Sequence, residues 1–161
     1  GKTFHEADDQ AGKLTEIHGQ RESAKNSPML PASPDELSRL VDPSDTKADL
    51  NLRVRSYLHA NCAICHIEAG GGNALIDLEF TTPTDQMRVI GAPPQHESFG
   101  IADAKLIAPA SAEHSVLFHR MSTRGRGQMP PLASARVDEQ ALAMLREWIN
   151  SAPPARRAEN R

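Results

Sequence analysis

The feature that most constrains this chain is a run of five residues, Cys62-Ala63-Ile64-Cys65-His66. Two cysteines three positions apart on a helical turn present both thiols to one flat ligand. The histidine that follows places an imidazole beside the same ligand. This C-x-x-C-H spacing is the signature of covalent haem attachment, in which each thiol forms a thioether with one vinyl group of a porphyrin. His66 then lies beneath the iron as its proximal ligand.

Three other uses of a C-x-x-C pair are open at this point. A structural zinc site needs four nitrogen or sulfur ligands. Cys62 and Cys65 are the only cysteines, so histidines such as His59 and His66 would have to complete it without zinc-finger spacing. A thioredoxin-like redox pair requires a βαβ context, which the sequence does not provide. A plain disulfide suits a secreted protein, but it gives no reason for the histidine that follows.

The composition favours one domain built around a large apolar group. The chain has 161 residues, 12 prolines and only 4% aromatic residues, so it fits one domain but has few large side chains for a core. A buried haem would supply that apolar centre. The net charge of −3 argues against a nucleic-acid binder, and no apolar run approaches the roughly 20 residues that span a bilayer. The chain starts at Gly1 without a signal peptide, and we expect a mature or excised fragment.

The sequence divides into three parts. Residues 1–44 are acidic overall, show no helical or strand period up to Leu30, and contain three prolines between positions 28 and 34. We expect them to be a linker or an N-terminal arm, either strapped on the surface or solvated. Residues 45–151 are predicted to form the haem domain, and residues 152–161 a polar tail.

The first helix of this domain is expected to run into the haem motif, with Ser44 or Asp45 as its N-cap. Its apolar stripe, at a spacing of four residues, comprises Leu50, Val54, Leu58 and Cys62. Arg53 and Arg55 fall off this stripe.

Two further helices are expected in the C-terminal half. One should begin at Ser111 and end near Ser122. Its inner face comprises Val116, Leu117 and Met121. The last should have Asp138 as its N-cap and end near Ser151. Its stripe comprises Ala141, Leu142, Leu145, Trp148 and Ile149. This helix should cross the first one, with its tryptophan in the core.

A long, partly extended segment separates the haem motif from the second helix. Gly70-Gly71-Gly72 ends the first helix and lets the backbone pass close to a flat cofactor. The glycine run lacks the lysine and the preceding strand of a phosphate-binding loop. His96 lies in this segment and is an alternative distal ligand, although loops often carry solvated histidines.

The second axial ligand is expected to be Met129. Its loop is stiffened by Pro130-Pro131, so a thioether can be held against the iron with little loss of entropy. Met121 and Met144 fall at helical core spacing and are expected to be packing residues. Three arginines in or before the loop can pair with haem propionates, form a basic rim, or simply be solvated. They are Arg120, Arg124 and Arg126.

Residues 42–151 resemble a class I c-type cytochrome. The resemblance depends on the C-x-x-C-H motif on the first helix, on Met129-Pro130-Pro131 in a late loop, and on a closing amphipathic helix. Residues 57–62, 70–73 and 78–82 resemble, more narrowly, the monohaem domains appended to the C-terminus of large secreted bacterial proteins. The resemblance implies an all-α, cytochrome c-like fold around one haem c, attached through Cys62 and Cys65 and ligated by His66 and Met129. The long loop between the two iron ligands departs from small members of this class.

The resemblance implies single-electron transfer to or from a redox protein or a fused redox domain, and no enzymatic activity of its own. It also implies a monomeric domain in the periplasm or outside the cell, because haem is attached outside the bacterial cytoplasm. The alternative is a haem enzyme or ligand sensor, peroxidase-like, with an open or displaceable sixth iron position. His96 or His119 would then be the distal acid–base residue. A third possibility is a non-haem interaction domain with a Cys62–Cys65 disulfide.

Overall fold

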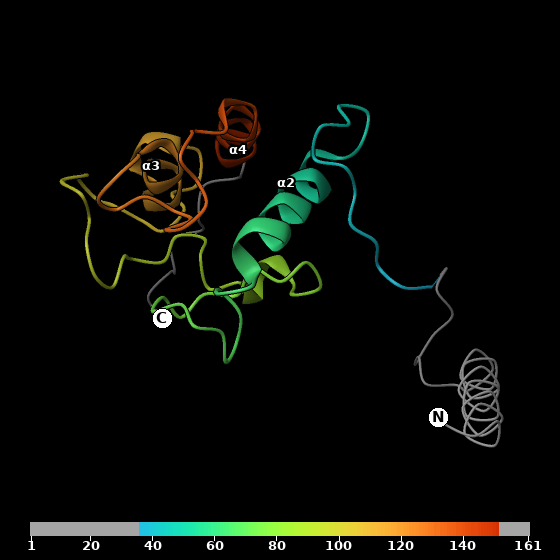
Figure 1. Ribbon diagram of the computed structural model, residues 1–161, viewed down its shortest axis with the longest axis horizontal. Helices are drawn as coiled ribbons and strands as arrows, with labels where there is room; N and C mark the ends of the chain where they lie inside the picture. Colours follow the sequence, from blue (N-terminus) through green and yellow to red (C-terminus); the bar gives the residue numbers. More distant parts are fainter. Residues whose placement is uncertain (1–35, 152–161) are drawn as a thin grey trace, which may run out of the picture. The chain divides into compact units, whose positions relative to one another are not determined.

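The computed structural model describes residues 36–151, and its regular structure is helical (Figure 1). The elements are α2 (Leu50–Leu58), the π-helix η1 (His59–Ala63), the 3-10 turns η2 (Thr84–Gln86) and η3 (Ala112–His114), α3 (Val116–Ser122) and α4 (Glu139–Ser151). Isolated bridges occur within residues 36–151, but no strand does. The predicted all-helical class is confirmed at this level. The predicted tail and most of the predicted arm lie outside the described residues.

The compact unit that carries the helices begins at Arg39. The backbone N–H of Val41 donates to Ser56 Oγ at 2.9 Å, and Arg53 Nε donates to the Pro43 carbonyl oxygen at 2.9 Å. Residues just before position 45 therefore pack against α2. None of the helices within residues 36–151 combines the length and the hydropathy needed to cross a membrane.

The first helix begins later than its predicted cap. Asp49 is the N-cap of α2, and its side chain accepts from the N–H of Leu52 at 3.0 Å. The predicted caps lie in earlier turns. Asp42 accepts from the N–H of Ser44, and Asp45 from that of Lys47. These short-range bonds favour successive turns over a helix, so the Ser44 or Asp45 prediction was wrong.

The haem motif does not continue α2 as an α-helix. After Leu58 the chain widens into the π-helix η1, which contains Cys62. The amides of Cys65 and His66 both donate to the Cys62 carbonyl, at 3.1 and 2.9 Å. The two cysteines thus share one tight turn, as their spacing predicts. A π-helical turn of this kind is rare and is frequently found at functional sites.

Helix α4 and its packing follow the prediction. Asp138 Oδ1 accepts from the N–H of Ala141 at 2.9 Å and caps the helix. Every residue of the predicted stripe is buried. Trp148 donates its indole N–H to Asn51 Oδ1 on α2 at 3.0 Å, and α2 and α4 contact each other. The crossing and the core role of Trp148 are confirmed.

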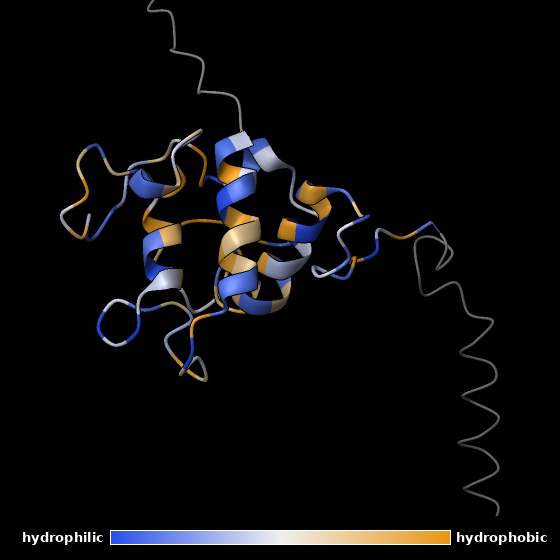
Figure 2. Ribbon diagram, turned by 90° about the horizontal axis from the view of Figure 1, so that it is seen from above, coloured by the Kyte–Doolittle hydropathy of each residue, from blue (hydrophilic) through white to orange (hydrophobic). Residues whose placement is uncertain are grey.

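Helix α3 is shorter than predicted. Ser111 opens the turn η3, whereas α3 itself begins at Val116 and ends at Ser122. Val116 and Met121 are buried, and Leu117 is half-buried and packs against the core. The helices carry both hydrophilic and hydrophobic residues (Figure 2), as expected of helices with one face in the core.

Arg55 is buried, with 4% of its surface exposed, although it lies off the apolar stripe. Its Nη2 atom donates to the carbonyl oxygens of Glu79 at 2.7 Å, Phe80 at 2.9 Å and Thr82. Its Nη1 atom donates to Thr84 Oγ1 at 3.2 Å. Burial lowers the pKa of Arg55. The guanidinium therefore holds the loop that follows the haem motif against α2.

The core is formed by the helices together with the long segment between η1 and α3. The largest fully buried apolar side chains are Leu58, Leu78, Met87, Ile107, Leu145, Ile149, Val54 and Val89. Half of these lie in the long segment, which has little regular structure. That segment is thus part of the fold's interior, and it positions the residues that follow the haem motif.

Candidate functional site

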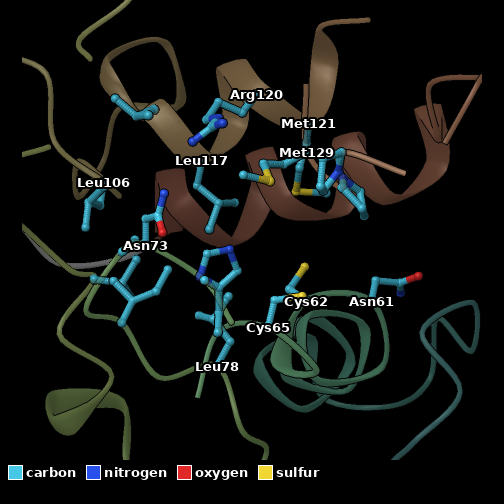
Figure 3. Close-up of a pocket in the computed structure, with 18 of the residues that line it drawn as sticks. Asn61, Cys62, Cys65, Asn73, Leu78, Leu106, Leu117, Arg120, Met121 and Met129 are labelled. Carbon is cyan, nitrogen blue, oxygen red and sulfur yellow. The ribbon is translucent and has the colours of Figure 1, made fainter. Parts of the chain in front are cut away.

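The residues singled out from the sequence meet in one cavity. Cys62, Cys65, His66 and Met129 all line a pocket of about 1310 Å³. Cys62 and Cys65 lie on one side of it, and Met129 lies across from them (Figure 3). The walls come from the haem motif, the segments 71–78 and 88–99, helix α3, and residues 124–138. The volume exceeds the roughly 300–1,000 Å³ of ordinary ligand pockets, so a large cofactor can enter.

The pocket carries apolar side chains that face open space. Ile64, Leu132 and Leu75 line it and are 83%, 81% and 68% exposed. Large apolar side chains gathered at one concave surface mark a site that receives an apolar ligand. A porphyrin ring has this character, whereas a bare metal ion does not.

The turn of the haem motif is held by backbone bonds from the residues that follow. The N–H of Gly72 donates to the Cys65 carbonyl at 2.9 Å, and the N–H of Leu78 donates to the His66 carbonyl at 2.8 Å. A Cβ atom on Gly72 would lie 2.7 Å from the Cys65 oxygen and 2.8 Å from His66 Nδ1. Glycine is needed here because the chain passes directly against the imidazole.

Both cysteines are free thiols in the structure. Cys65 is exposed, whereas Cys62 is half-buried. Burial, and next the neighbouring Cys65, raise the pKa of Cys62 to about 11. Among residues 36–151 no group of three or more His, Cys, Asp or Glu side chains comes together to hold an ion.

His66 is half-buried and lines the pocket. Its Nδ1 atom is buried and has no hydrogen-bond partner among the described residues. Burial, and next the positive charge of Arg120, lower the pKa of His66. A lowered pKa favours the neutral imidazole over the imidazolium, and the neutral form is the one that binds a metal. This Nδ1 atom lies against Gly72, so the other ring nitrogen, Nε2, is the one left to bind a metal. The residues present thus fit a haem.

Two methionines, not one, reach the pocket. Met129 is half-buried, and its N–H donates to the Arg120 carbonyl at 3.0 Å. Met121 is buried on α3, as predicted for a packing residue, but it also lines the pocket beside Met129 (Figure 3). Met144 is buried in the core and is not part of the lining. The sequence assigned one thioether to the site, and the fold brings a second one to it.

The Met129 loop is cross-linked by polar side chains. The Gln128 side chain accepts from the Gly125 N–H at 2.8 Å and donates to Ser134 Oγ at 3.1 Å. Ser134 Oγ donates to the Pro130 carbonyl at 2.5 Å. These bonds join both ends of the loop, so its stiffness comes from hydrogen bonds as well as from the prolines.

The other histidine candidates separate clearly. His96 is exposed and lines the pocket. His119 is outside the lining, and its ring packs on Phe99 with centroids 4.9 Å apart. His59 Nδ1 accepts from the N–H of Phe80 at 3.1 Å and holds the loop after the motif. Only His96 of these three can reach a ligand in this pocket.

The three arginines also differ. Arg120 and Arg124 line the pocket, whereas Arg126 does not. Arg124 donates to the carbonyl oxygens of Met121, Thr123 and Arg136, so its guanidinium is occupied in joining the two ends of the loop. Arg120 Nε donates to the carbonyl oxygen of Gly127 in the loop. The sequence pointed to none of these hydrogen bonds.

Phe99 was missed altogether by reasoning from sequence. It lines the pocket from the long segment, and its φ of +54° is left-handed. A phenylalanine followed by Gly100 in a proline-rich loop was the signal available. Its contacts are made with residues twenty or more positions away, which the local sequence does not reveal.

No protein-family model, curated protein or solved structure matches this chain.

Proposed function

We propose that this chain is a monohaem c-type cytochrome that transfers single electrons. The observation that carries the proposal is the convergence of Cys62, Cys65, His66 and Met129 on one apolar pocket. Two thiols in one turn, an imidazole directly after them and a thioether across the cavity are the attachment and ligand set of a His/Met haem c.

Each of these residues has a distinct role in the proposal. Cys62 and Cys65 would hold the haem through thioether bonds, and His66 and Met129 would bind its iron from opposite sides. When bound, the haem supplies a one-electron ferric/ferrous couple. A thioether ligand is soft and raises the reduction potential, and so does the apolar wall of the pocket. With His66 and Met129 both bound to the iron, the protein would carry an electron and bind no substrate there.

The proposal extends to the setting of the protein. On its sequence resemblance, the chain is the monohaem domain of a large secreted bacterial protein, working in the periplasm or outside the cell. Its electron partner would be a separate redox protein or a fused redox domain. It would be a class I cytochrome without enzymatic activity of its own.

One observation favours a second candidate function. His96 is exposed, lies in an irregular segment and lines the pocket. If the sixth iron position is open or displaceable, His96 is placed to act as a distal acid–base residue, and a peroxidase-like enzyme or ligand sensor results.

The visible spectrum of the protein, with and without carbon monoxide, tests the proposal. Wild type should contain one low-spin haem, show the weak red-end sulfur-to-iron band when oxidised, and not bind carbon monoxide when reduced. Met129→Ala should abolish the band, lower the potential and open the iron to carbon monoxide. Met121→Leu is the matched control and should keep the band.

Each contrary result has a definite meaning. A colourless protein after expression with a haem-attachment system would rule out haem c as the cofactor. A wild-type protein that binds carbon monoxide readily would favour the haem enzyme or ligand sensor over the electron carrier. Loss of the band in Met121→Leu, but not in Met129→Ala, would exchange the roles of the two methionines.

A further inference from the structure

Arg120 holds the Met129 loop at two points. Its backbone carbonyl accepts from the N–H of Met129 at 3.0 Å. Its side-chain Nε donates to the carbonyl of Gly127 at 2.9 Å. One residue of α3 therefore ties down both Met129 and the residue two positions before it. The rest of the Arg120 guanidinium extends along the pocket wall (Figure 3).

Phe99 backs this arrangement from a different part of the chain. Its ring lies under the Arg120 guanidinium, and Arg120 Cζ is 5.5 Å from the centroid of the Phe99 ring. The same ring packs on His119, with the planes inclined by 35°. Cation–π and aromatic contacts of this geometry are favourable. Phe99 thus fixes the side chain that fixes the loop.

The Phe99 ring also lies directly against the loop backbone. A Cβ atom on Gly127 would be only 2.7 Å from Phe99 Cε1, and Gly127 has a φ of +90°. Phe99 itself adopts a left-handed φ of +54°, which is uncommon for a bulky side chain. Such strain persists only where the surroundings hold the residue firmly, and it clusters at ligand clamps.

We propose that Phe99 and Arg120 are positioning residues that keep Met129 on the iron and so prevent its replacement by external ligands. This rests on the proposed function. Met129 would leave the iron whenever the loop moved away from the pocket. Phe99, Arg120 and the close approach at Gly127 resist that movement, so they set the fraction of molecules whose sixth position is open.

The test is an imidazole titration of the ferric, haem-containing protein. Imidazole binding is measured by the loss of the sulfur-to-iron absorption band. Phe99→Leu and Arg120→Lys should each raise the apparent imidazole affinity about tenfold or more, which corresponds to about 1.4 kcal/mol. Lysine keeps the positive charge near His66 but loses the planar face and the Nε donor. Gly127→Ala should act in the same direction, because its methyl group meets the Phe99 ring.

The chain offers a matched control in Arg146. Its guanidinium lies over the Phe118 ring at 4.5 Å and pairs with Glu113, away from the pocket lining. Arg146→Gln removes a contact of the same kind, so it should leave imidazole affinity unchanged at whatever cost in thermal stability. Imidazole affinities of Phe99→Leu and Arg120→Lys equal to that of Arg146→Gln would overturn the proposal, even if all three melt at lower temperature.

This failure differs from failure of the proposed function. If wild type lacks haem, lacks the sulfur-to-iron band or binds carbon monoxide, the His66/Met129 assignment fails before any variant is made. If wild type behaves as proposed and the variants do not gain imidazole affinity, only the positioning role of Phe99 and Arg120 fails.

Discussion

Replacing Arg55 with methionine should destabilise the folded protein by about 3 kcal/mol. Arg55 Nη2 carries two hydrogens but faces three carbonyl oxygens, those of Glu79, Phe80 and Thr82. With the bond from Nη1 to Thr84 Oγ1, the guanidinium makes about three hydrogen bonds at a time. Methionine matches the apolar stem and makes none of them.

The magnitude follows from two opposing contributions. Hydrogen bonds from a charged donor stabilise by about 1.5–3 kcal/mol each, or about 5–9 kcal/mol for three. Methionine relieves the desolvation of a buried charge, worth several kcal/mol, and the exposed Glu79 can rehydrate its carbonyl. The net loss is about 2–4 kcal/mol, which lowers the melting temperature by about 8–16 °C for a domain of this size.

Urea unfolding of the haem-containing protein, followed by circular dichroism, measures this loss. Arg53→Met is the control, because Arg53 lies on the same helix but donates one side-chain bond, to the Pro43 carbonyl, and should cost less than about 1 kcal/mol. Arg55→Lys keeps the charge on a side chain one bond shorter, so its stability should fall between wild type and Arg55→Met. A stable Arg55→Met, or Arg55→Lys equal to wild type, would refute the hydrogen-bond reasoning.

Three more predictions concern the site. Gly72→Ala should lower haem yield, because its Cβ would meet the Cys65 carbonyl and His66. Gly71→Ala should not, because nothing lies within 4 Å of a Cβ at that position. Equal haem yields from the two variants would contradict the close approach at Gly72. In the haem-free protein near pH 8, iodoacetamide should alkylate Cys65 at least roughly tenfold faster than Cys62, whose pKa is raised to about 11 by burial. Mass spectrometry measures both alkylation rates, and equal rates would contradict this prediction. Tyr57 is the only tyrosine. Burial, and next the neighbouring Asp138 carboxylate, raise the pKa of Tyr57 above the usual 10.0. Its stabilising effect should therefore be complete below about pH 10 and lost as the pH rises further. Its tyrosinate absorbance should titrate well above pH 10 in the native protein and near pH 10 in urea, and a native midpoint near 10 would contradict this.

What could be predicted from the sequence rests on short-range patterns. The turn that joins Cys62 to His66 and the cap at Asp138 depend on residues within four positions of each other, and so local spacing reveals them. The start of α2 was missed because several Asp and Ser residues before it are all able to cap a helix. Asp49 takes that role.

The sequence by itself determined the turn from Cys62 to His66, the closing helix and the methionine-proline loop. Only the tertiary structure decided that Arg55 is buried by distant carbonyls, that Met121 shares the pocket with Met129, and that Phe99 supports Arg120. The physical reason is the same in each case. These positions depend on contacts between residues far apart in the chain, whose free energies are settled by packing and not by local backbone preference.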